Sequence, residues 1–205
     1  METWQHDYIT TNGVNLHYVT QGSGPLMLML HGFPEFWYSW RYQISEFAAD
    51  FKVVAPDLRG YNDSDKPELQ SAYVISELVR DVEGIIRGLG YEKCVLVAHD
   101  WGAAIAWSFA YAYPQMLERL MIMNCPHPAK FSEGLRTPQQ LLRSWYMFFF
   151  QLPVIPEFFL QSQDYQFIEN AFKGMAIKKS AFSTEDINAY KDAAAKRGAL
   201  TAMIN

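Results

Sequence analysis

One aspartate, Asp100, ends an apolar stretch and begins a run of small residues within VLVAHDWGAAIAW, residues 95–107. Small residues around a possible nucleophile, here Ala98, Gly102 and Ala103, are typical of a nucleophile elbow between a strand and a helix. A carboxylate attacks alkyl carbon by displacement and forms an ester. The residue type therefore indicates opening of an epoxide ring or displacement of halide from carbon. The alternative is that Asp100 only caps the helix that follows it.

A second motif, HGFPE at residues 31–35, follows another apolar run. A glycine at position 32 allows backbone N–H groups to point into a site. We predict that the N–H groups of Phe33 and Trp101 form an oxyanion hole, because Trp101 comes directly after the nucleophile. The remaining residues that we assign to these motifs and the substrate pocket are His31, Gly32, Pro34 and His99.

The elements that must position these motifs alternate between strand-like and helix-like patterns. Apolar runs predict strands over residues 14–19, 25–30, 51–57, 93–98 and 117–124. One-sided or small-residue patterns predict helices over residues 39–49, 75–90 and 102–113. Such alternation predicts an α/β fold, with a mostly parallel sheet covered by helices on both faces. Chemistry in open α/β sheets collects at the carboxyl ends of the strands, where both motifs are expected.

The pattern changes after residue 127, where we expect no further strands. Residues 1–127 are predicted to form the core, and residues 128–205 a helical cap. Thr137 is expected to cap a helix, and Ser183 and Asp186 match a capping box. The predicted cap helices cover residues 138–150, 162–172 and 183–196.

Composition narrows the class of protein. The chain has 205 residues, of which 50% are hydrophobic, and a net charge of -5. A large packed core is therefore expected, and nucleic acid is not an expected partner because no basic stripe is present. Cys94 and Cys125 form no metal or redox motif, so we expect neither a metal nor a cofactor. The sequence shows no secretory signal and no run long enough to span a bilayer. We therefore expect a cytoplasmic protein without a membrane partner.

Three segments together, HGFPEFWYSW, PDLRGYNDSDKP and AHDWGAAIAW, resemble the α/β-hydrolase-fold epoxide hydrolases, which are related to the haloalkane dehalogenases. The resemblance covers nearly the whole chain. It implies that Asp100 attacks an epoxide carbon, that Phe33 and Trp101 form the oxyanion hole, and that Tyr146 donates a hydrogen bond to the epoxide oxygen. It also implies an apolar epoxide and water as reactants, a vicinal diol as product, and no cofactor. The alternative for Tyr146 is an ordinary core aromatic residue.

The chain departs from this family in one respect. The family's second cap tyrosine, acid and catalytic histidine lie beyond the first cap helices, whereas this sequence ends at Asn205. We therefore expect a hydrolase truncated within the cap and lacking the last two strands, so that turnover is doubtful. Residues 117–124 would then be an open sheet edge that favours self-association. None of the five histidines fits the missing base: His6, His17, His31, His99 and His127.

Two other functions stay open at this stage. A haloalkane dehalogenase-like hydrolase would share the fold and the aspartate nucleophile. Phe33 stands where some dehalogenases carry an asparagine that binds halide, which favours the epoxide. A hydrolase-fold protein that binds small apolar ligands without turnover is the other alternative, because the catalytic histidine is missing.

Overall fold

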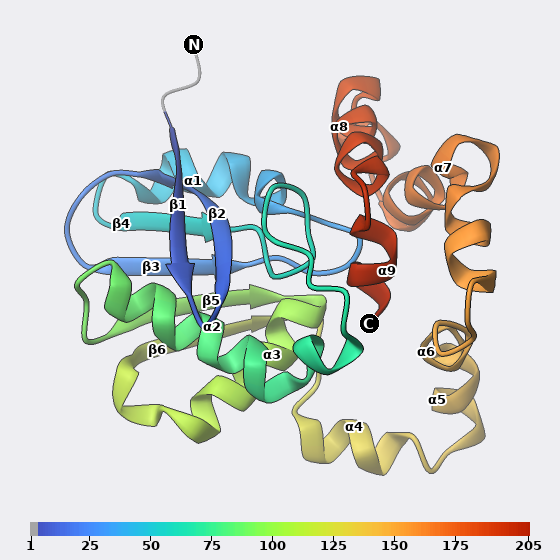
Figure 1. The fold of residues 1–205 in the computed structure, drawn as a ribbon, viewed down its shortest axis with the longest axis horizontal. Coiled ribbons are helices and arrows are strands. Elements are labelled where there is room, and N and C mark those ends of the chain that lie inside the picture. Colours follow the sequence, from blue (N-terminus) through green and yellow to red (C-terminus); the bar gives the residue numbers. More distant parts are fainter. Residues whose placement is uncertain (1–3) are drawn as a thin grey trace.

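Six strands form a single sheet in the computed structural model, which describes residues 4–205 (Figure 1). They are β1 (Gln5–Thr11), β2 (Val14–Gln21), β3 (Leu26–Leu30), β4 (Lys52–Pro56), β5 (Cys94–His99) and β6 (Leu117–Met123). Their order in the sheet is β1-β2-β4-β3-β5-β6. Strands β4, β3, β5 and β6 are parallel neighbours, while β2 is antiparallel to both β1 and β4. The predicted α/β fold with a mostly parallel sheet is confirmed.

Strand β1 was not predicted from the sequence. Its side chains are mostly exposed, so it shows no apolar alternation. It pairs with β2 through a tight turn in which Asn12 and Gly13 both have positive φ, 47° and 73°. An Asn-Gly pair between two strands is a strong hairpin signal, and it could have revealed this strand.

The helices between the strands follow the predicted pattern. They are η1 (Trp37–Trp40), α1 (Arg41–Phe47), η2 (Gln70–Tyr73), α2 (Ile75–Gly88), α3 (Asp100–Ala112) and η3 (Pro114–Met116). Helix α2 buries Val79, Val82, Ile85 and Ile86, which lie on one side of a helix with 3.6 residues per turn. Helix α3 packs against α2 and against β5 and β6. Its small residues therefore bring the start of α3 close to the sheet.

Every element from residue 128 onward is a helix within the described part of the chain. They are α4 (Pro128–Gly134), α5 (Pro138–Arg143), α6 (Trp145–Phe149), α7 (Ile155–Met175), η4 (Lys179–Ala181), α8 (Thr184–Ala195) and α9 (Ala199–Ile204). They lie to one side of the sheet, beyond the arrowheads of β4 and β5 (Figure 1). The predicted N-terminal capping residues of two helices are confirmed. Thr137 accepts a hydrogen bond from the Gln140 N–H at the start of α5, and Ser183 and Asp186 form a capping box at the start of α8.

Two predicted cap helices differ from the structure. The helix predicted over 138–150 is divided into α5 and α6, because the backbone at Ser144 leaves the helical region and its side chain accepts a hydrogen bond from Gln140. The helix predicted over 162–172 lies within α7, whose backbone is not helical from Ser162 to Tyr165. Helices α4 and α9 were not predicted, although a proline at the first position of α4 is a known start signal.

Candidate active site

Asp100 stands at the sharp turn between β5 and α3. Its φ is 50°, a left-handed conformation that is rare for a residue with a Cβ. A Cβ added at Gly102 would lie 2.3 Å from the carbonyl oxygen of His31, and one added at Gly32 would lie 2.5 Å from the Cβ of Asp100. Both positions therefore need glycine. The elbow and the HGFPE loop are packed in direct contact, as the sequence predicted.

The backbone N–H of Phe33 donates a hydrogen bond to Oδ1 of Asp100, with an N···O distance of 3.0 Å. This contact joins the two predicted motifs although they are 67 residues apart in the chain. Trp101 follows at the start of α3, and its side chain is 38% exposed. The contribution of the Trp101 N–H to an oxyanion hole stays a prediction.

His31 is fully buried, and both of its ring nitrogens bind the backbone. Nε2 accepts a hydrogen bond from the N–H of Leu58 at 3.0 Å, so the neutral ring donates from Nδ1 to the carbonyl oxygen of Gly32 at 2.9 Å. Burial lowers the pKa of His31, which favours this neutral form. His31 therefore shapes the HGFPE loop, and Pro34 continues that loop after a cis peptide bond with Phe33.

His99, directly before Asp100, forms a pair that the sequence reasoning missed. Its Nδ1 lies 3.1 Å from Oε2 of Glu35, and its Nε2 lies 3.2 Å from the side-chain amide of Asn124. The hydrogen bond to Glu35 raises the pKa of His99. Burial alone would raise the pKa of Glu35, but the hydrogen bond and charge of His99 lower it overall. Glu35 also accepts the N–H of Gly32 at 2.9 Å, so it ties the HGFPE loop to the elbow.

Tyr146, the predicted cap donor, lies on α6 and is partly buried. Burial, and after it the negative charge of Asp100, raises the pKa of Tyr146. The phenol therefore keeps its proton at neutral pH. The ring of Tyr146 also packs against Phe150, with centroids 5.9 Å apart. Phe150 in turn contacts Phe33 at 5.3 Å, which connects α6 with the HGFPE loop.

A largely apolar cavity of about 280 Å³ lies between the core and the cap helices. Its lining comprises Leu58, Arg59, Tyr61, Tyr73, Ile75, Leu78, Trp101, Ala104, Ile105, Met147, Phe150, Gln151 and residues 202–205. Asp100 and Tyr146 are not part of this lining, and neither are His31, Gly32, Pro34 and His99. Their neighbours Trp101, Met147 and Phe150 are. The cavity is therefore adjacent to Asp100 and Tyr146 in the chain, and its apolar lining suits an apolar group.

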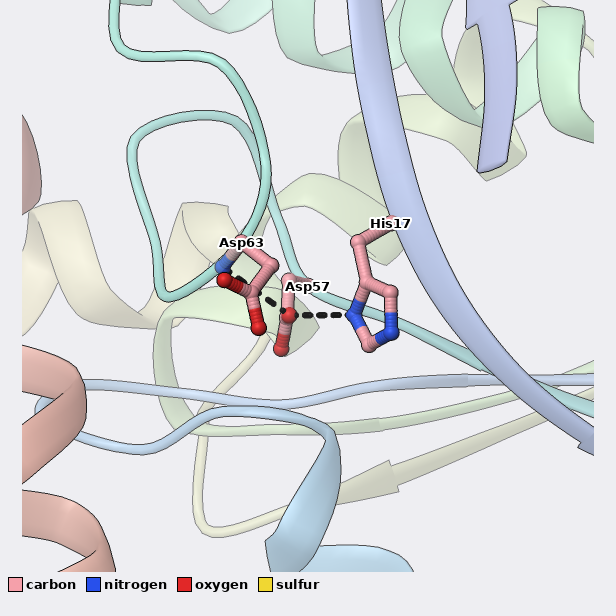
Figure 2. Close-up of side chains that lie close together, drawn as sticks. All are labelled: His17, Asp57 and Asp63. Atoms are coloured by element: carbon pink, nitrogen blue, oxygen red, sulfur yellow. Dashed lines mark hydrogen bonds and ion pairs between the residues drawn. The ribbon is translucent and has the colours of Figure 1, made fainter. Parts of the chain in front are cut away.

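One cluster outside this site has the residue types of a metal centre. His17, Asp57 and Asp63 offer ligand atoms that lie within 4.8 Å of one another (Figure 2). Nδ1 of His17 is directed at Oδ2 of Asp57, 2.6 Å away. The same oxygen accepts hydrogen bonds from the Asn62 side chain at 2.8 Å and from the Asp63 N–H at 3.3 Å. Because hydrogen-bond donors already surround this carboxylate, the cluster does not fit a metal ion.

The fold and the elbow together define a class of protein. Residues 25–168 match the family model described as alpha/beta hydrolase fold, and the chain belongs to this family. Within it, the chain is similar to epoxide hydrolase 4 of Mus musculus, with 46% identity over 96% of this chain and 57% of the relative. It is also similar to epoxide hydrolase 1 of Caenorhabditis elegans, with 45% identity over 97% of this chain and 51% of the relative. The chain thus spans about half the length of these curated relatives.

Two similar solved structures narrow the family to which the chain belongs. The epoxide hydrolase of Bacillus megaterium in complex with an inhibitor matches with a TM-score of 0.90 and 43% identity, over 97% of this chain and 69% of that chain. An epoxide hydrolase from Vigna radiata matches with a TM-score of 0.85 and 31% identity, over 100% of this chain and 71% of that chain. The chain therefore belongs to the epoxide hydrolase branch of the α/β-hydrolase fold family. Among residues 4–205, no helix has the length and apolar character needed to cross a membrane.

Proposed function

We propose that this chain carries the nucleophile-bearing part of an epoxide hydrolase, which opens epoxides to vicinal diols through an ester on Asp100. The observation that carries the proposal is the left-handed elbow at Asp100, with its Oδ1 held by the Phe33 N–H at 3.0 Å. That hydrogen bond orients the carboxylate and leaves Oδ2 as the attacking atom. In this proposal residues 1–127 supply the core and residues 128–205 the cap.

Ring opening needs a donor for the leaving oxygen. Oδ2 of Asp100 forms a bond to an epoxide carbon, the C–O bond breaks, and the released oxygen takes the phenolic proton of Tyr146. The charge of Asp100 contributes to the raised pKa of Tyr146. This contribution disappears once Asp100 has become a neutral ester, so Tyr146 becomes a stronger acid as the ring opens. A halide leaving group needs no proton, and a phenol near Asp100 therefore favours an epoxide over an alkyl halide.

Hydrolysis of the ester needs an activated water. The N–H groups of Phe33 and Trp101 would stabilise the tetrahedral intermediate, but they cannot remove a proton from water. His31 binds the backbone through both nitrogens, and His127 is held by Tyr111 and the start of α4. His99 is paired with Glu35. We propose that none of these histidines acts as the base and that the ester accumulates on this chain.

The reactants follow from the same geometry. We propose a small apolar epoxide, with its substituent in the cavity beside Trp101 and Phe150, and water as the second reactant. We further propose a cytoplasmic location, which is compatible with the unpaired cysteines Cys94 and Cys125. Neither nucleic acid nor a membrane is required.

An adduct experiment tests this function. The 205-residue chain is incubated with a reactive aryl epoxide and followed by intact-protein mass spectrometry and by diol analysis. We expect one added substrate mass, located by peptide mapping within residues 94–107, and almost no diol. Steady diol release would show that the chain holds a working base. Folded protein that gains no mass would favour the non-catalytic binding protein.

A further inference from the structure

The segment from His31 to Trp37, which contains the HGFPE loop, is tied at both ends to two consecutive residues directly after β4. At the start of this segment, His31 accepts the N–H of Leu58 at 3.0 Å. At its end, the N–H of Trp37 donates to Oδ1 of Asp57 at 3.1 Å. The Phe33 N–H that contacts Asp100 lies between these two attachments. The position of this N–H therefore depends on where Asp57 and Leu58 stand.

Asp57 is completely buried, so its carboxylate depends on protein donors instead of water. Oδ1 accepts the N–H of Trp37, while Oδ2 accepts His17, Asn62 and the N–H of Asp63. A carboxylate with donors on both oxygens holds the segments that supply them in one arrangement. These segments are β2, the start of η1 at Trp37 and the loop after β4.

His17 contacts Asp57 from the side opposite Asp63, as Figure 2 shows. The ring donates to Oδ2 of Asp57 at 2.6 Å, and the carbonyl oxygen of His17 accepts the N–H of Asp57 at 2.9 Å. Ser64 joins the same two residues, since its hydroxyl accepts the His17 N–H and donates to the Asp57 carbonyl oxygen. His17 is 2% exposed, and Asp57 therefore has little freedom to move relative to β2.

We propose that Asp57, supported by His17, is a positioning residue that sets the Phe33 N–H against the carboxylate of Asp100. The inference rests on the proposed function, because it assigns Asp57 a role in the chemistry of Asp100. Asp57 touches neither Asp100 nor the cavity, so it acts only through the loop between His31 and Trp37. If the attachment is loosened, Asp100 loses the hydrogen bond that orients its attacking oxygen.

The test compares two substitutions on one loop. Asp57→Asn replaces one carboxylate oxygen with an NH2 group. This group faces the donors that bound the carboxylate, so the attachment is disrupted. Asp65→Asn is the matched control, since Asp65 is exposed on the same loop and accepts the Asn15 N–H of the same strand β2. Two properties are measured on the 205-residue chain: the rate of alkylation as a function of aryl epoxide concentration, and hydrogen exchange of residues 31–37.

For Asp57→Asn we expect alkylation to slow about 10-fold, less than the loss of a whole oxyanion donor. The slowing should appear in the rate at saturating epoxide and not in the half-saturating epoxide concentration, because Asp57 does not line the cavity. Exchange of the Phe33 amide should accelerate, and Asp65→Asn should change none of these properties. A merely structural role would lower the fraction of chain that forms the adduct and leave the saturating rate of the folded fraction unchanged.

A third variant covers the case in which Asp57→Asn does not fold. His17→Gln removes one donor from Asp57 and should produce the same changes at smaller size. A folded His17→Gln or Asp57→Asn with unchanged exchange at residues 31–37 and an unchanged saturating rate of alkylation would overturn the inference. So would equal changes in Asp65→Asn. If the unmodified chain forms no adduct, the proposed function fails, and the exchange measurement still decides whether Asp57 holds the loop.

Discussion

The HGFPE loop and the segment that carries Tyr146 are held in opposite ways. Polar contacts fix the loop at His31, Glu35 and Trp37, and its surroundings are buried. Tyr146 lies on α6, which is only five residues long and follows a break at Ser144. Within residues 4–205, the side-chain hydrogen bonds described for α5 and α6 stay inside that segment. The proposed nucleophile is thus preorganised by the sheet, whereas the proposed acid depends on aromatic packing.

The cap itself shows the same contrast. Helix α8 is attached to the core through Asp186, which pairs with Arg41 at 2.9 Å and accepts the Tyr38 hydroxyl at 3.0 Å. In α5 and α6, large apolar side chains are exposed instead, with Leu142 at 75% and Phe148 at 60%. The two halves of the cap are therefore expected to differ in stability, and the half that carries the proposed acid is the weaker one.

Removing the proposed nucleophile should have the largest effect. Asp100→Ala is expected to slow adduct formation more than about 10³-fold, because no other carboxylate stands at the elbow. Asp192→Ala on the exposed face of α8 is the control and should alkylate normally. The measurement is intact-protein mass after exposure to the aryl epoxide. An adduct that persists in Asp100→Ala would contradict the covalent mechanism.

Removing the proposed acid should cost less. Tyr146→Phe keeps the ring packing against Phe150 and is expected to slow alkylation by about 10- to 100-fold, the lower range for a positioned acid. Tyr42→Phe, at an exposed phenol, is the control. An unchanged rate in Tyr146→Phe would return Tyr146 to the class of packing aromatics. The difference in how the HGFPE loop and the Tyr146 segment are held would then have no consequence for the reaction.

The attachment of α8 can be weakened separately. Asp186→Asn leaves Arg41 without its anionic partner, and is expected to lower the free energy of unfolding by about 2 kcal/mol. Burial alone would raise the pKa of Asp186, but hydrogen bonds from Ser183 and Tyr38 and the charge of Arg41 lower it overall. A lowered pKa stabilises the fold above the unfolded value near 4, and this stability is lost as pH falls through the folded value.

Urea unfolding at neutral and acidic pH measures this effect. The difference between the unmodified chain and Asp186→Asn should shrink below about pH 4. Asp192→Asn, at an exposed position on the same helix α8, is the control. A difference that stays constant with pH would show that Asp186 acts through packing and not through its charge.

The smallest effect is expected at the sheet edge. Strand β6 ends the sheet in the described part of the chain, and Met121 on it is 47% exposed. We expect the 205-residue chain to self-associate through this edge, and Met121→Lys to reduce the association several-fold. Sedimentation velocity over a concentration series measures this. A monodisperse monomer for the unmodified chain would contradict the expectation.

Much of the fold was predictable because it depends on local patterns. The buried strands β3 and β5 are continuous apolar runs, and the elbow at Asp100 needs the small residues that surround it. Local sequence patterns did not predict the elements whose structure depends on contacts with other segments. Strand β1 has exposed, polar side chains and forms by pairing with β2. The helix break at Ser144 lies within an apolar run that reads as one helix.

The sequence by itself determined the place of the elbow at Asp100, its small neighbours and the alternation that builds a parallel sheet, since each depends on residues within one turn or strand. That Asp100 is the nucleophile stays a prediction. Only the tertiary structure decided which side chains hold the elbow. Glu35 meets His99 across 64 residues, and His17 meets Asp57 across 40. Such pairs depend on which strands lie side by side, and no local pattern encodes that order. The elbow is therefore recognisable from the sequence, whereas its supports become visible only once the sheet is assembled.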